Sequence, residues 1–262
     1  MKFKTLEIDD SRKNIVTVTL NRPEFRNAIN SEMMRDLRDL WQEIYVNPKA
    51  IRCIILTGKG DKAFCAGADL KERNDIDVET WQSQHAVLEQ AMLAMLSCPV
   101  PIIAAVNGPA FGGGLELVLA SDFAYAATGA TFALPETKLG IMPGAMGTQN
   151  LPRACGARRA KEICFTGAAF SAEEALAWGI INKICAPGEL LPEALSTAEK
   201  IAGNAPLAIR QVKTAINASE QMDLTAGYMY ELEAYNRLLP TQDRLEGINA
   251  FNEKRRAEFK EK

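Results

Sequence analysis

The stretch GPAFGGGLELVLAS (Gly108–Ser121) places three consecutive glycines and one carboxylate, Glu116, in an otherwise apolar run. A carboxylate buried without a partner is costly, and consecutive glycines weaken a helix or a strand. Both departures from good core design occur together, which indicates a site. The run PIIAAV before it predicts a buried strand that ends in a turn, and GGGLELVLAS begins a short helix.

Strands and helices alternate on both sides of this stretch. Before it, we expect strands at 14–20 and 53–58 and helices at 31–45, capped by Asn30 or Ser31, and at 78–96. After it come the strands DFAYAAT and TFAL, the helices RRAKEICFTG and SAEEALAWG, and then helices only, at about 189–201, 206–219, 224–238 and 243–259. The pattern predicts an α/β core, assigned to residues 1–195, and a C-terminal helical region at 196–262.

Composition narrows the class of protein. The chain has 262 residues, 47% of them hydrophobic, and a net charge of −3, which does not favour a nucleic-acid or membrane-surface partner. Six cysteines without a CxxC pair indicate reduced thiols and a cytoplasmic location. The start of the sequence shows no apolar leader, and the prolines and glycines within 98–121 argue against a membrane span there.

Several kinds of chemistry lack residues to carry them. His85 is the single histidine, and its polar neighbours in WQSQH suggest a surface or otherwise satisfied side chain. No GxSxG motif offers a serine nucleophile, no His/Cys spacing suggests a metal site, and neither GxGxxG nor GxxxxGK[ST] is present. What remains is acid–base work by carboxylates, together with hydrogen bonds from backbone N–H groups.

Two glutamates are candidates for that work. Glu116 falls in the first turn of the expected helix, where an acid also interacts favourably with the helix dipole, and Glu136 follows Pro135 in a loop or at a helix start. Spacing alone does not show that the two meet. If they do, they titrate as a coupled pair, and one holds a proton while the other accepts one. Such a pair suits adding or removing water next to a carbonyl.

Several motifs together resemble the crotonase (enoyl-CoA hydratase/isomerase) superfamily. They are LNRPEFRNAIN, AFCAGADL, NGPAFGGGLEL, SDFAYAATGATFALPETKLGIMPGAMGTQNLPR and FNEKRRAEF, which run in the family's order from about residue 19 to 259. FCAGADLKER with GGGLEL, ETKLGI and PTQDRLEG is most similar to the methylglutaconyl-CoA hydratase branch and to short-chain enoyl-CoA hydratases. The resemblance implies an α/β crotonase fold, a spiral of ββα repeats with a C-terminal helical trimerisation region, and a homotrimer or a dimer of trimers.

The resemblance also implies a reaction. An enoyl-CoA hydratase adds water reversibly and syn to a 2-enoyl-CoA thioester, giving a 3-hydroxyacyl-CoA, in fatty-acid or branched-chain or aromatic acid catabolism. Its only coenzyme is the CoA of the substrate. By resemblance, the N–H groups of Ala66 and Gly113 would hold the thioester oxygen. Glu116 would deprotonate the water, and Glu136 would supply the proton to the α-carbon.

Substrate contacts follow by resemblance as well, with Phe251 and Lys254 often reaching CoA across a subunit boundary. The implied contacts are Arg26, Ala28, Gly67, Ala68, Asp69, Leu70, Gly112, Pro135, Gly144, Phe251 and Lys254. The acyl pocket should be lined by residues 70–96 and the C-terminal helices. The chain departs from many relatives at Glu24, where they carry lysine, and at Met146 and Asn150.

Two alternatives stay open. One is another acyl-CoA reaction of the superfamily, such as methylglutaconyl-CoA hydration, double-bond isomerisation, decarboxylation or dehalogenation. The presence of both glutamates favours hydration over the last three. The other is a non-catalytic or RNA-associated protein. An RNA-binding member of the nearest branch uses lysines on its first helix, whereas SEMMRDLRDLWQEIY has two arginines and no lysine, so RNA binding is not carried over.

Overall fold

The computed structural model describes residues 3–48 and 50–262. Its strands are β1 (Leu6–Asp9), β2 (Ile15–Leu20), β3 (Cys53–Gly58), β4 (Ile102–Val106), β5 (Ala110–Phe111), β6 (Phe123–Ala127), β7 (Thr131–Ala133), β8 (Phe170–Ser171) and β9 (Lys183–Cys185). Its helices are α1 (Ser31–Val46), α2 (Val78–Leu96), α3 (Gly113–Ala120), α4 (Gly147–Thr166), α5 (Ala172–Ala177), α6 (Leu190–Ala202), α7 (Pro206–Ser219), α8 (Leu224–Asn236) and α9 (Gln242–Asn252), with 3₁₀ turns η1 (Pro23–Phe25) and η2 (Glu136–Leu139).

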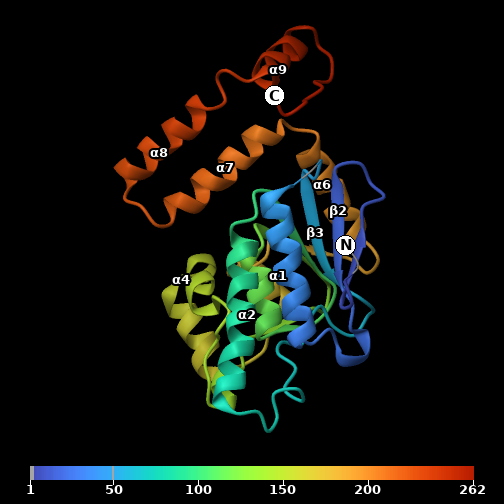
Figure 1. Cartoon of the computed structure of the whole chain (residues 1–262), viewed down its shortest axis with the longest axis vertical. Helices are drawn as coiled ribbons and strands as arrows, with labels where there is room; N and C mark the ends of the chain where they lie inside the picture. The colour runs from blue at the N-terminus through green and yellow to red at the C-terminus, as the bar shows by residue number, and fades with distance from the viewer. Residues whose placement is uncertain (1–2, 49) are drawn as a thin grey trace.

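The larger sheet has the order β1-β2-β3-β4-β6-β9 and is parallel except for β1. Alternate residues of β3 face opposite sides: Leu56 packs with α1 and α2, while Ile55 packs against α6. Helices therefore cover both faces (Figure 1), as the uninterrupted apolar strands β3 and β4 require.

The smaller sheet has the order β5-β7-β8, and two of its short strands, β5 and β7, come just after the strands β4 and β6 of the larger sheet. β4, β5 and α3 follow one another, and so do β6, β7 and α4. Each set is a ββα unit, so the expected α/β fold of repeated ββα turns is confirmed.

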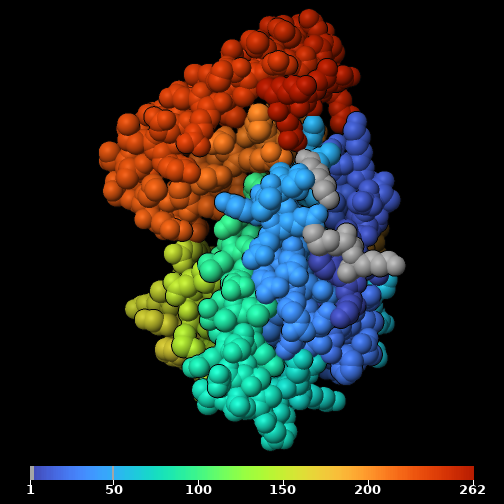
Figure 2. Space-filling model, viewed as in Figure 1, coloured from blue at the N-terminus to red at the C-terminus, as the bar shows by residue number. Residues whose placement is uncertain are grey.

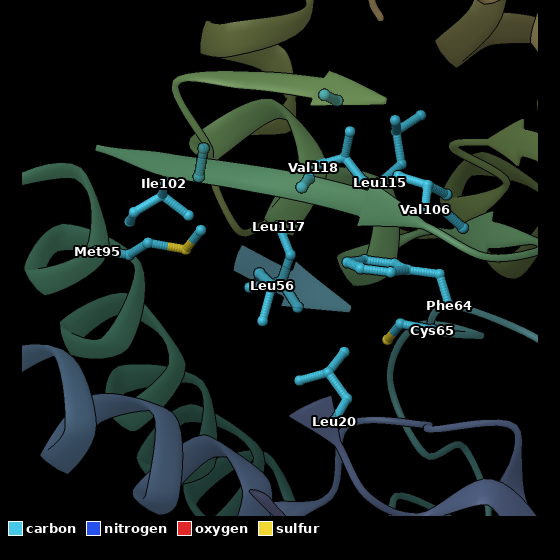
Figure 3. Packing of buried hydrophobic residues seen from close by; sticks show 14 of the residues in the cluster. Leu20, Leu56, Phe64, Cys65, Met95, Ile102, Val106, Leu115, Leu117 and Val118 are labelled. Carbon is cyan, nitrogen blue, oxygen red and sulfur yellow. The ribbon is translucent and has the colours of Figure 1, made fainter. Parts of the chain in front are cut away.

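The core holds helix α3 firmly in place. Leu115 and Leu117, on either side of Glu116, are buried, and they lie among Leu56, Phe64 and other core residues in Figure 3. The position of the Glu116 backbone is therefore set by close packing rather than by a flexible loop.

The C-terminal helices α7, α8 and α9 extend away from the sheet and form a lobe of their own (Figures 1 and 2). The tail beyond α9 returns to the core, where the Arg52 guanidinium donates 2.7 Å to the Phe259 carbonyl oxygen. A boundary at residue 195 would cut α6, whose Ala194 and Ala198 are buried against the sheet. We propose that the helical region begins after α6.

Most expected elements are confirmed, with Asn30 as the cap of α1. Two expectations were wrong. RRAKEICFTG is only the second half of α4, which begins at Gly147 and continues across a kink at Gly156 (φ 77°, ψ 154°). The last helix ends at Asn252 rather than near 259, and Lys254 has φ 55°. No helix among the described residues has the length and apolar character needed to cross a membrane.

Candidate active site

The glycine triplet lets the start of α3 pack directly against the loop after β3. Gly112 caps the helix with φ 52° and ψ −125°, and its N–H donates to the Ala133 carbonyl oxygen at 2.9 Å. A Cβ on Gly114 would stand 2.2 Å from the Cys65 carbonyl oxygen, where no side chain fits. The glycines thus bring α3 into contact with the AFCAGAD segment.

Glu116 is buried, with 3% of its surface exposed, and its carboxylate is held by the segment that leads into α4. One carboxylate oxygen, Oε1, accepts hydrogen bonds from the N–H groups of Ala145 (2.7 Å) and Gly147 (2.9 Å). The other, Oε2, lies 4.0 Å from where a Cβ on Gly113 would be. The GAMGTQ segment therefore fixes the carboxylate through Oε1, while Oε2 points toward the glycines at the start of α3.

Glu136 begins η2, just after β7, and reaches the glycines that follow the neighbouring strand β5. Its Oε1 lies 2.9 Å from the place that a Cβ on Gly112 would take. Its Oε2 is buried and has no hydrogen-bond partner among the described residues. The two glutamates, which spacing could not bring together, thus converge on Gly112 and Gly113.

Burial raises the pKa of both carboxyl groups. The pKa of Glu116 rises from 4.5 to about 7, because burial and the charge of Glu136 outweigh the N–H groups of Gly147 and Ala145, which stabilise the anion. Burial also raises the pKa of Glu136. At neutral pH the pair is therefore suited to hold one proton between them.

This raised pKa makes stability depend on pH. Between pH 4.5 and about 7 the folded chain keeps a proton on Glu116 that the unfolded chain has released. The free energy of unfolding therefore falls as pH rises through this window, by on the order of 1–3 kcal/mol. Glu116→Gln should remove this fall, because an amide does not titrate.

Urea denaturation at pH 5 and pH 8 measures the effect. The difference in unfolding free energy between the two pH values should be smaller in Glu116→Gln than in the wild type. Glu199→Gln, a change at an exposed carboxylate on α6, serves as the control and should keep the wild-type difference. An unchanged difference in Glu116→Gln would contradict the raised pKa.

The backbone donors differ from those expected. The N–H of Ala66 donates to the Arg26 carbonyl oxygen at 3.0 Å, so the assignment of Ala66 to the thioester oxygen was wrong. The Ile29 N–H donates to the Gly67 carbonyl oxygen, and the Ile29 carbonyl oxygen accepts the Asp69 N–H. The N–H of Ala68, which lies between these two residues, therefore points away from Ile29. Gly113, the first residue of α3, has no acceptor within its helix. Among the described residues, the N–H groups of Ala68 and Gly113 therefore have no backbone acceptor and are the candidate donors to the thioester oxygen.

Three residues expected to contact CoA also support the loops, and their contacts with CoA stay predictions. The Asp69 carboxylate is buried and accepts two hydrogen bonds, each 3.0 Å, from the Arg22 guanidinium. Arg22 also donates to the Ala28 carbonyl oxygen at 2.6 Å, and Ala28 is buried. Arg26 is exposed, and its carbonyl accepts the Ala66 N–H. None of these three side chains faces the cavity described next.

A cavity of about 410 Å³ opens beside the two glutamates. Its lining includes most of the expected positions: Gly67, Ala68, Leu70, Gly112, Gly113, Pro135 and Gly144, with Glu116 and Glu136. Within the described part of the chain, the C-terminal helices take no part in the lining. Phe251 stands away from it with 83% of its surface exposed, and Lys254 is exposed too. Leu139, Ile141 and Met142 form the wall expected from those helices.

The wall expected from residues 70–96 is present, formed by α2 and the loop before it, although the sequence did not single out which of its side chains face the cavity. Arg73, Trp81, His85 and Leu88 all line the cavity. His85 was expected to be a surface or otherwise satisfied side chain. It is partly exposed and its Nε2 lies 3.5 Å from the Glu89 carboxylate, but its ring also lines the cavity, where a Cβ on Gly144 would meet it at 2.7 Å. The available signal was the spacing of Trp81, His85 and Leu88, which puts all three on one helical face.

Comparison with known proteins gives the family. A model of the enoyl-CoA hydratase/isomerase family matches residues 10–262. The chain belongs to this family. The YngF protein of Bacillus subtilis is 46% identical over 248 residues, which cover 95% of each chain. The crotonyl-CoA hydratase of Syntrophomonas wolfei is 37% identical, with 99% of each chain covered.

Solved structures agree. The enoyl-CoA hydratase from Bacillus anthracis superposes with a TM-score of 0.96 at 41% identity, covering 99% of this chain and 100% of the other. This member of the enoyl-CoA hydratase/isomerase family is therefore an enzyme of the hydro-lyase type, and its substrates are acyl-CoA thioesters.

Proposed function

We propose that the enzyme adds water reversibly and syn to a 2-enoyl-CoA, giving a 3-hydroxyacyl-CoA. One observation carries the proposal: the carboxylates of Glu116 and Glu136 meet over Gly112 and Gly113. A pair that holds one proton supplies a base and an acid at once.

The geometry supports a defined role for each group. The N–H groups of Ala68 and Gly113 hold the thioester oxygen and stabilise the negative charge that it gains as an enolate. The reaction starts from the state of the coupled pair in which their shared proton lies on Glu136 and Glu116 is ionised. Glu116 takes a proton from water, and the hydroxide oxygen bonds to the β-carbon. Protonated Glu136 then gives its proton to the α-carbon. Addition is syn because both carboxylates work from the same side of the acyl chain.

No group beyond the CoA of the substrate enters these steps, so we propose that the enzyme needs no cofactor. Cys53, Cys65, Cys98 and Cys185 are buried free thiols, which supports a reducing compartment, and we place the enzyme in the cytoplasm. Its reaction fits the breakdown of fatty acids or of branched-chain or aromatic acids.

A panel of 2-enoyl-CoA thioesters tests the proposal. Loss of the conjugated thioester absorbance, together with a product heavier by one water, should occur with at least one short chain. An isomerase would instead give a product of unchanged mass. If no thioester of any length loses its absorbance, the proposal of hydration is wrong.

We also propose that a second and a third copy of the chain cover the exposed apolar side chains of the C-terminal helices. Leu224 on α8 and Phe251 on α9 are 90% and 83% exposed, and Ile216 on α7 is 59% exposed. A lobe that presents so many large apolar side chains is typical of a subunit interface. In such a homotrimer, or dimer of trimers, Phe251 and Lys254 of one subunit would reach the CoA of its neighbour.

Replacing Ile216 and Leu224 together by aspartate should shift the assembly toward monomer, because the charges would be buried in the interface. Light scattering after size exclusion measures the mass. Val46→Asp, at an equally exposed apolar residue on α1, is the control and should leave the mass unchanged. A monomeric wild type would contradict the proposed assembly.

A further inference from the structure

A largely buried ion pair adjoins Ala68, one of the two candidate donors to the thioester oxygen. The side chains of Arg22 and Asp69 are each only 11% exposed, and two hydrogen bonds of 3.0 Å join the guanidinium to one carboxylate oxygen, Oδ2. Asp69 follows Ala68 in the chain, yet neither member of the pair lines the cavity. Because desolvation offsets much of the attraction between buried charges, such a pair is weak evidence of a role in stability alone.

Arg22 joins the two loops that meet at Ala68. Its Nη1 donates to the Asp69 carboxylate, in the loop after β3, and also to the Ala28 carbonyl oxygen, at 2.6 Å, in the loop after β2. The Phe25 ring lies against the guanidinium, 4.5 Å from its carbon to the ring centre. A guanidinium presents several donors in one rigid plane, so this one side chain reaches both loops at once.

The loop after β2 is itself a rigid frame. Arg26 and Asn27 both have a left-handed backbone, with φ 52° and 56°, which persists only where the surrounding structure imposes it. Asn27 is buried, and its side-chain amide donates to the carbonyl oxygens of Lys59 (3.0 Å) and Ala63 (2.9 Å) in the loop after β3. The two loops are therefore fixed against each other before Arg22 adds its hydrogen bonds.

The direction of the Ala68 N–H is set by the peptide that joins it to Gly67. The Gly67 carbonyl and the Ala68 N–H belong to one trans peptide, so they point in opposite directions. The Ile29 N–H donates to that carbonyl oxygen at 2.8 Å, which aims the Ala68 N–H away from Ile29. A Cβ on Gly67 would lie 3.5 Å from the nitrogen of Gly113, so the two candidate donors are close together. The anchored Asp69 side chain holds the next residue and keeps this peptide from rotating.

We propose that Arg22 and Asp69 are positioning residues for hydration: their ion pair keeps the Ala68 N–H aimed at the thioester oxygen, so the rate depends on two side chains that do not touch the acyl group. This inference rests on the proposed hydratase function. Losing one such donor costs about 10²- to 10³-fold in rate, and a donor turned aside loses much of the same stabilisation. The loss falls on kcat, because the oxygen gains its charge only as the enolate forms.

Steady-state kinetics with crotonyl-CoA give the first test. Arg22→Lys keeps the positive charge, but an ammonium lacks the planar fork that reaches Asp69 and Ala28 together. Its kcat should fall by about 10- to 100-fold, with KM changed by less than about 3-fold. Asp69→Asn should lose kcat in the same way. Arg12→Lys, in an exposed ion pair with Glu199, is the control and should keep wild-type kcat and KM.

The absorbance of a bound dienoyl thioester reads the donors without turnover. Hydrogen bonds to the thioester oxygen draw charge along a conjugated chain, so 2,4-hexadienoyl-CoA should absorb at a longer wavelength when bound than when free. The measurement is made in a Glu136→Gln background, in which the thioester is consumed slowly. Adding Arg22→Lys should reduce the shift by roughly half, because one of two donors is turned aside. Adding Arg12→Lys should leave the shift unchanged.

A double variant separates positioning from folding. Arg22→Met with Asp69→Leu leaves no unpaired buried charge, so the chain should keep its fold, but nothing then holds the Ala28 carbonyl oxygen and the shift should still shrink. A full shift with normal kcat in this variant would overturn the inference. A rise in KM with kcat unchanged in Asp69→Asn would also overturn it and assign Asp69 to CoA. A wild type that hydrates no thioester would overturn the proposed function, while the shift would still decide the role of the pair.

Discussion

Replacing Glu116 or Glu136 by glutamine should lower kcat for hydration of a short 2-enoyl-CoA by about 10²- to 10⁴-fold. The amide keeps the size of the side chain, and its oxygen can still accept the N–H groups of Ala145 and Gly147 at position 116. It neither takes a proton from water nor gives one to carbon. The loss should therefore fall on kcat, with KM changed much less.

The double variant separates a working pair from two independent residues. Because each glutamate needs the other, the double variant should be only slightly slower than the slower single variant. Glu199→Gln, on the far helix α6, is the control and should keep wild-type turnover. Near-normal turnover in either single variant would contradict the paired mechanism, and so would losses that multiply in the double variant.

Gly114→Ala should destabilise the fold strongly, by about 3 kcal/mol or more, although it adds only one methyl group. The new Cβ would stand 2.2 Å from the Cys65 carbonyl oxygen and 2.9 Å from the Cys65 Cβ. Both Cys65 and Leu115 are fully buried, so neither the loop nor α3 can move aside without opening the core. Urea denaturation gives the loss as a lower midpoint.

Gly129→Ala provides the comparison. Gly129 has φ 85° and nothing within 4 Å of an added Cβ, so its replacement carries only the left-handed backbone strain, about 1–2 kcal/mol. Gly114→Ala should lose clearly more than this. Equal midpoints for the two variants would show that α3 is not held against the Cys65 loop as tightly as the structure indicates.

The sequence predicted those parts of the site that depend on local pattern. The glycine triplet before Glu116 indicated a special helix start, and the structure shows why: Gly112 and Gly114 have no room for side chains. The apolar runs of β3 and β4 predicted a sheet buried on both faces. Each of these features depends on residues that are close in the chain.

The parts that failed depend on tertiary contacts. The Ala66 N–H is taken by the Arg26 carbonyl oxygen and the Ala68 N–H is left free beside Ile29, so both outcomes depend on residues far earlier in the chain. His85 sits beside polar residues in sequence, but the helix turns Gln82 and Ser83 outward and the His85 ring toward Gly144. The roles of Phe251 and Lys254 remain predictions, because the cavity of one chain does not include them.

Hydration of crotonyl-CoA in D₂O tests the central claim most directly. If Glu116 and Glu136 act from one side of the acyl chain, the wild type should form 3-hydroxybutyryl-CoA with one deuterium at C2, on the same face as the new hydroxyl group. Deuterium NMR of the product distinguishes the two faces. A mixture of both faces at C2, or loss of conjugation without gain of water, would contradict the paired-carboxylate mechanism.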